Sequence, residues 1–144
     1  MGIVIRNGEV VTASERFVAD LRLDGGTITA MGTKLEPKAG DETIDAAGQF
    51  VLPGFIDPHV HMELGFMGTV SADDFEVGTA SGAAGGTTCI IDFCIPAPGE
   101  SMLAALDSWR RKAAKAVCDY SFHMAITSWN EHSADEMRAV VEEH

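Results

Sequence analysis

The sequence is poor in basic residues. Its 144 residues include 10 Lys and Arg against 22 Asp and Glu, which gives a formal net charge of −12. Nucleic acids and anionic membrane surfaces are bound through clustered positive charge, so we expect neither as a partner. The one basic cluster, residues 110–112 with Lys115, lies on a predicted helix and is interpreted as a solvated face.

Cysteine and long apolar runs are also scarce. The three cysteines, Cys89, Cys94 and Cys118, form an odd number without C-x-x-C spacing, and two of them lie in apolar runs typical of strands. Buried, reduced thiols are therefore expected, as in a cytoplasmic protein. No apolar run reaches the roughly 18 residues of a membrane helix, and Arg6 and Asn7 interrupt the first one, so no signal peptide is predicted.

Turn residues divide the first fifty residues into short β-segments. Asn7-Gly8 and Asp24-Gly25-Gly26 each separate two apolar runs and predict β-hairpins, because the turn positions tolerate a positive φ. Together with a further extended segment they predict a small β unit over residues 1–52. The expected strand segments are 3–6, 9–12, 18–23, 27–32 and 43–53.

After Pro53 the pattern alternates between strands and helices. Strands are predicted at 55–61, 87–95 and 119–127, and helices at 71–86, 99–117 and 133–144. Ser71 and Ser133 are the expected N-caps and Gly85-Gly86 the terminator of the first helix. Buried strands alternating with helices predict a parallel sheet, either doubly wound or the beginning of a (β/α)8 barrel. Because VVEEH stops in mid-helix, we expect a longer protein.

Two histidines, His59 and His61, stand at the end of the first of these strands. Residues i and i+2 of a strand share a face, with Cβ atoms roughly 6–7 Å apart, so two imidazoles can converge on one metal ion. In a parallel barrel, sites lie at the C-terminal ends of the strands, where this pair falls. Taken by itself, an H-x-H pair could also be two structural histidines.

The residues around the pair extend this pattern to a family. The segment DETIDAAGQFVLPGFIDPHVH resembles the first barrel strand of the amidohydrolase superfamily and its approach, with the motif G-x-x-D-x-H-x-H. The segments GTVSADDF, GGTT and DYSFHMAIT resemble the cyclic amidohydrolase branch, the dihydropyrimidinases and D-hydantoinases. This resemblance covers essentially the whole sequence.

The resemblance implies an α/β fold with a metal-dependent (β/α)8 hydrolase barrel, of which residues 53–144 form the first three βα units. Residues 1–52 would form part of a small β-sandwich domain. It also implies two divalent metal ions, zinc by default, bridged by a carboxylated lysine. His59 and His61 match two metal ligands, whereas the lysine, the other ligands and the catalytic aspartate are expected beyond residue 144. The chain alone is therefore expected to be inactive.

The implied activity is hydrolysis of the cyclic amide bond of dihydropyrimidines, giving N-carbamoyl-β-amino acids, and of hydantoins. An allantoinase or dihydroorotase is the nearest alternative, but no Arg between Arg22 and Arg110 offers a carboxylate clamp. A non-catalytic scaffold relative is a third possibility, which the retained H-x-H pair opposes. The relatives are usually homotetramers, so we expect a homo-oligomer that acts on a small molecule.

Other residues are given roles with alternatives. Asp57 is interpreted as a carboxylate that orients a metal ligand, or as an acceptor for backbone N–H groups at the strand end. Asp92 and His123 are expected to form a hydrogen-bonded pair inside the barrel, although a satisfied core histidine is the simpler role. Four apolar loop residues are expected to line the substrate pocket, or else to pack on the barrel rim: Met62, Leu64, Phe66 and Met67.

Overall fold

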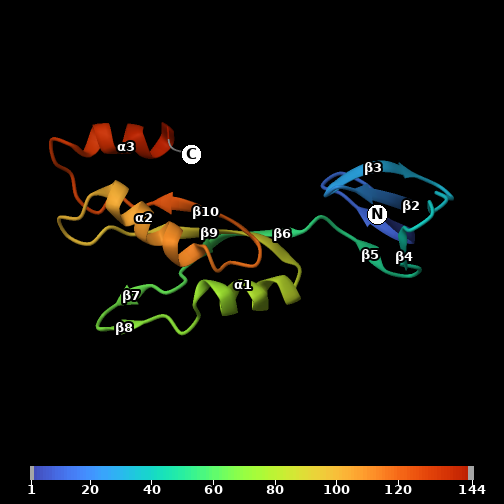
Figure 1. Ribbon diagram of the computed structural model, residues 1–144, viewed down its shortest axis with the longest axis horizontal. Helices are drawn as coiled ribbons and strands as arrows, with labels where there is room; N and C mark the ends of the chain where they lie inside the picture. The colour runs from blue at the N-terminus through green and yellow to red at the C-terminus, as the bar shows by residue number, and fades with distance from the viewer. Residues whose placement is uncertain (1, 143–144) are drawn as a thin grey trace. The chain divides into compact units, whose positions relative to one another are not determined.

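The computed structural model describes residues 2–142, so the predicted end of the last helix lies partly outside the described residues (Figure 1). The chain divides into two compact units, and the boundary between them falls between Pro53 and Gly54. No helix within residues 2–142 is long and apolar enough to cross a membrane.

The first unit is a five-stranded sheet in the order β3-β2-β1-β4, with β5 also paired to β1. Its strands are β1 (Ile3–Val11), β2 (Arg16–Asp24), β3 (Thr27–Gly32), β4 (Glu42–Asp45) and β5 (Phe50–Val51). β1, β2 and β3 are antiparallel neighbours, whereas β4 and β5 run parallel to β1. Val10, Ala19 and Leu21 form its buried apolar cluster.

One of the two predicted hairpins in this unit is confirmed and the other is wrong. Gly25 and Gly26 connect β2 to β3 with φ values of 57° and 80°, as predicted. At Asn7-Gly8, however, β1 continues, and its register with β2 shifts between Ile5 and Gly8. Asn7 has a φ of 61° there. A positive φ suits a β-bulge as well as a turn, so the residue types alone did not distinguish the two.

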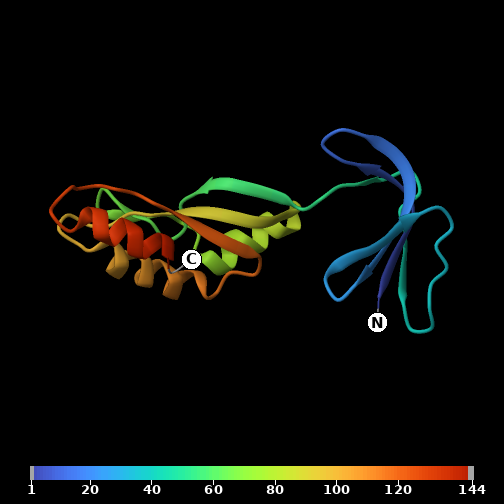
Figure 2. The same ribbon diagram turned by 90° about the horizontal axis from the view of Figure 1, so that it is seen from above.

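The second unit is a three-stranded parallel sheet in the order β10-β9-β6, with a helix following each strand. This confirms the predicted strand–helix alternation. The strands are β6 (Phe55–Val60), β9 (Thr87–Cys94) and β10 (Asp119–Met124); the helices are α1 (Phe75–Ala84), α2 (Met102–Ala113) and α3 (Ser133–Glu142). Figure 2 shows α1 and α2 along the same side of the sheet. Between them and β9 lies the helix-side core, formed by Phe75, Ile90, Cys94, Ala105, Leu106, Trp109 and Ala113.

The helix ends differ in part from the prediction. α1 is capped by Asp74, whose carboxylate accepts a backbone N–H of the first turn, and not by Ser71. Ser133 is the first residue of α3, and its hydroxyl accepts the N–H of Asn130, so its predicted role as N-cap is also wrong. Gly85-Gly86 ends α1 as predicted, with Gly86 at a φ of 96°.

Candidate metal centre

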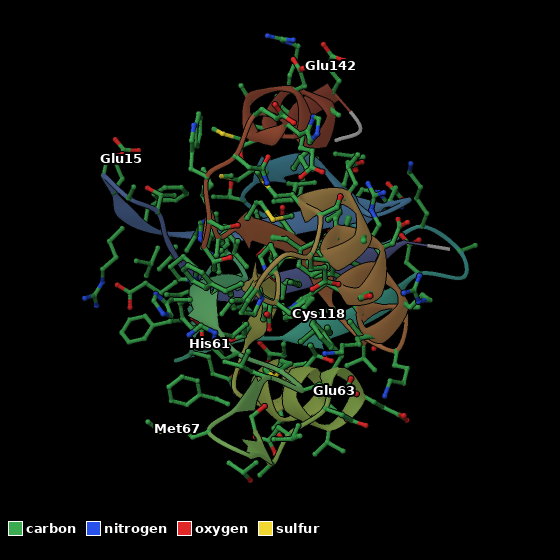
Figure 3. The ribbon with its side chains drawn as sticks, turned by 90° about the vertical axis from the view of Figure 1, so that its left-hand side faces the viewer. Glu15, His61, Glu63, Met67, Cys118 and Glu142 are labelled. Atoms are coloured by element: carbon green, nitrogen blue, oxygen red, sulfur yellow. The ribbon has the colours of Figure 1, made fainter. Side chains whose placement is uncertain are left out.

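His59 and His61 lie side by side at the C-terminal end of β6. Their ring centroids are 5.1 Å apart and the ring planes are perpendicular. Both side chains are exposed (His61 is labelled in Figure 3). Within residues 2–142, no hydrogen bond involves the ring of His59 or that of His61; the backbone N–H of His59 donates to Asp57. The ring nitrogens are therefore available to a ligand.

A phenylalanine packs against both histidines and against a third. The ring centroid of Phe93 on β9 lies 4.5 Å from that of His59, 5.2 Å from that of His61 and 4.7 Å from that of His123 on β10. The Nε2 atom of His123 is 3.0 Å from the carbonyl oxygen of Pro58, to which its N–H can donate. Four rings from three neighbouring strands thus share one face of the sheet, which we call the histidine face.

The backbone of β6 is irregular at the histidine pair. Asp57 and Val60 pair with residues only two apart on β9, so Pro58 and His59 face a single residue there. Pro58 has no N–H to donate to a neighbouring strand. The carboxylate of Asp57 accepts the backbone N–H of His59 at 3.2 Å. Asp57 therefore acts as an acceptor for a backbone N–H, one of the two roles considered for it. It could influence a metal ligand only through the backbone of His59.

The pair predicted between Asp92 and His123 is wrong. Asp92 pairs in register with Phe122, the residue before His123, so the two side chains point to opposite faces of the sheet. The Asp92 carboxylate is buried on the helix side, where it accepts the N–H of Met62 at 2.7 Å and the indole N–H of Trp109 at 3.1 Å. Burial raises the pKa of this carboxyl, and the two N–H donors oppose that rise.

The four residues predicted to line the pocket fall into two groups. Met62 and Leu64 are half-buried against the helix-side core, and a Cβ on Gly78 of α1 would lie only 2.4 Å from Sδ of Met62. Phe66 and Met67 are 64% and 89% exposed. They belong to a small unpredicted hairpin of β7 (Gly65–Phe66) and β8 (Thr69–Val70), with Met67 at its tip (Figure 3). The packing favours a structural role for the first pair only.

The histidine pair fits part of a metal site. Imidazole nitrogen is a common ligand of zinc, and also suits other divalent transition metals. Within the described part of the chain, residues 2–142, no group of three or more His, Cys, Asp or Glu side chains could hold an ion. Because zinc takes about four ligands, this pair would supply a part of the coordination shell.

Known proteins with similar sequences include the enzymes that the sequence segments resemble. No family model matches the chain. A dihydropyrimidinase of Dictyostelium discoideum is 48% identical over 142 residues, which cover 98% of this chain and 28% of that protein. A D-hydantoinase of Geobacillus stearothermophilus is 46% identical over 141 residues, which cover 97% of this chain and 30% of that protein. This chain is homologous to the dihydropyrimidinases and D-hydantoinases.

A solved structure has a similar fold. A crystal structure of a D-hydantoinase matches with a TM-score of 0.95 and 45% identity, covering 100% of this chain and 31% of that one. The resemblance seen in the H-x-H strand and the segments after it is therefore confirmed. The chain spans less than a third of the length of these dihydropyrimidinases and D-hydantoinases.

Proposed function

We propose that the complete protein containing this sequence is a metal-dependent hydrolase of cyclic amide bonds, acting on dihydropyrimidines and hydantoins. The names of the homologous enzymes support this substrate class. The observation that carries the proposal is the adjacent pair of His59 and His61, with ring centroids 5.1 Å apart and both rings open to a ligand. The retained pair opposes the alternative of a non-catalytic scaffold relative.

We further propose that β6, β9 and β10 are the first three strands of a (β/α)8 barrel, and that the first unit is part of a β-sandwich domain. The parallel order of the three strands, each followed by a helix, supports the barrel. So does the position of the histidines, because enzymes with this fold carry their sites at the C-terminal ends of the strands.

His59 and His61 would hold one of two divalent ions, zinc by default, with a carboxylated lysine outside this chain as the bridge. When bound, the ions would acidify water to give a nucleophile at neutral pH and polarise the amide carbonyl. The protein's own residues prepare the site. Phe93 packs against both imidazoles, and the carboxylate of Asp57 accepts the backbone N–H of His59.

Phe66 and Met67 would contact the ring of the substrate or its substituent. Both are exposed on the hairpin that follows the histidine pair. Aromatic and thioether side chains form adaptable apolar contacts, which suit a small ring. Met62 and Leu64 would instead anchor the loop through their packing on the helix-side core.

A cytoplasmic location is part of the proposal. Cys89, Cys94 and Cys118 are free thiols, and reduced cysteines are typical of the cytoplasm. Burial raises the pKa of the Cys94 thiol to about 12, so it is expected to remain an unreactive core residue.

Ring opening of 5,6-dihydrouracil and hydantoin by the complete protein tests the proposal. The rate should fall to background after chelation and return when zinc is added. Turnover of allantoin or dihydroorotate in place of these substrates would transfer the protein to the neighbouring cyclic amidases. A protein that is isolated without metal and takes up none would refute the metal-dependent mechanism and favour the scaffold relative.

A further inference from the structure

A buried carboxylate lies on the face of β9 opposite the histidine face. The side chain of Asp92 belongs to a residue only 1% exposed, and none of the ion pairs within residues 2–142 involves it. Burying an unpaired carboxylate is unfavourable unless hydrogen bonds compensate for the lost hydration. Two donors point at it: the N–H of Met62 at 2.7 Å and the indole N–H of Trp109 at 3.1 Å. A carboxyl group is thus buried where an apolar side chain would not lose hydration.

The position of the hydrogen bond from the Met62 N–H to Asp92 indicates what this carboxylate does. Met62 directly follows His61, so Asp92 holds the first peptide after the second histidine. The next residue is held by a helix: Nζ of Lys112 on α2 donates to the carbonyl oxygen of Glu63 at 3.1 Å. Glu63 itself has a φ of 48°, a conformation that non-glycine residues seldom adopt without support. The two residues after His61 are therefore held by β9 and α2.

We propose that Asp92 is a positioning residue for His61: by fixing the N–H of Met62 it sets the direction in which the His61 imidazole leaves the strand. This inference rests on the proposed metal centre. A hydrogen bond to a carboxylate is about twice as strong as one between neutral groups, and it is protected here from water. Removing a group that orients a metal ligand through a hydrogen bond typically lowers the metal affinity by about 10–100-fold.

The zinc affinity of the complete protein carrying Asp92→Asn tests this role. The amide has nearly the same size, but the two donors contact different carboxylate oxygens, and the NH2 group that replaces one of them leaves one donor without an acceptor. We expect zinc to bind at least about 10-fold more weakly, measured by competition with a chromogenic chelator. Cobalt(II) in place of zinc should show an altered visible absorption spectrum, because the spectrum reports the direction of the ligands and not the stability of the fold.

Cys94→Ala is the matched control, since Cys94 is two residues further on the same strand, on the same face and fully buried. It should lower stability but leave zinc affinity within about twofold and the cobalt spectrum unchanged. Wild-type affinity in a folded Asp92→Asn protein, or equal weakening by Cys94→Ala, would overturn the inference. If the wild-type protein itself binds no zinc, the proposed function fails instead.

A second variant keeps the test available if Asp92→Asn does not fold. Replacing the amide between His61 and residue 62 by an ester removes the N–H that Asp92 accepts, makes the His61 carbonyl a weaker acceptor and leaves every side chain in place. The same weakening of zinc binding is expected. Unchanged zinc affinity in the ester protein would refute the positioning role directly.

Discussion

Gly54→Ala tests how closely β9 must approach the strand that carries the histidines. A Cβ on residue 54 would lie 2.1 Å from Oγ1, 2.4 Å from Cγ2 and 2.7 Å from Cβ of Thr88. Thr88 is the extra residue at a shift in register between β6 and β9, and its side chain fills the space beside the glycine. Rotation of Thr88 moves the first two atoms but not Cβ. The two strands must therefore separate by about 1 Å to restore a normal carbon–carbon contact.

Overpacking of this kind is expected to lower the free energy of unfolding by about 1–3 kcal/mol. Denaturant unfolding of the complete protein, followed by circular dichroism, measures the change. Gly65→Ala is the control, because no atom lies within 4 Å of its added Cβ. Measured against Thr88→Gly alone, Gly54→Ala should have little effect, since the opposing side chain is gone. Equal stability of Gly54→Ala and Gly65→Ala, or an undiminished loss in the Thr88→Gly background, would refute the reasoning.

Three further predictions concern the site and the first unit. Phe93→Leu should weaken zinc binding several-fold while the protein stays folded, because both imidazoles lose a packing partner; zinc competition checks this, and unchanged affinity contradicts it. Phe66→Ala should change the relative kcat/KM among 5-substituted substrates, whereas an equal loss on all of them would remove Phe66 from the pocket. Arg22 holds the pKa of Asp41 well below its usual range. The Asp41 carboxylate therefore stabilises the fold above about pH 4. This stabilisation is lost as the pH falls through the lowered pKa. Asp41→Asn should therefore lower stability at pH 7 and flatten its decline below pH 4 in pH-dependent unfolding; an unchanged acid profile would contradict this.

The sequence was most informative where a pattern repeats along the chain. Alternating apolar strands and amphipathic helices predicted the parallel sheet, and the H-x-H pair predicted two rings on one face. Both follow from local periodicity, which the sequence displays directly. Asn7-Gly8 shows the limit of this approach, because a bulge and a hairpin require the same positive φ. Only the pairing with β2 decides between them.

The contacts around the site depend on information that no single strand contains. The pairing of Asp92 with His123 failed because the face each residue occupies depends on the register between β9 and β10. Phe93 was not singled out, since an apolar residue in a buried strand looks the same whether it fills a core or supports two histidines. Met62 and Leu64 likewise could not be separated from Phe66 and Met67 before the packing of α1 and α2 was known.

His59 and His61 are proposed to hold a metal ion together. Anomalous diffraction at the zinc absorption edge, from crystals of the complete protein grown with zinc, tests this proposal most directly. An anomalous peak is expected about 2.0–2.1 Å from one ring nitrogen of each histidine, and His61→Ala should remove or displace it. Zinc peaks at other positions with none at this pair would contradict a metal site at His59 and His61.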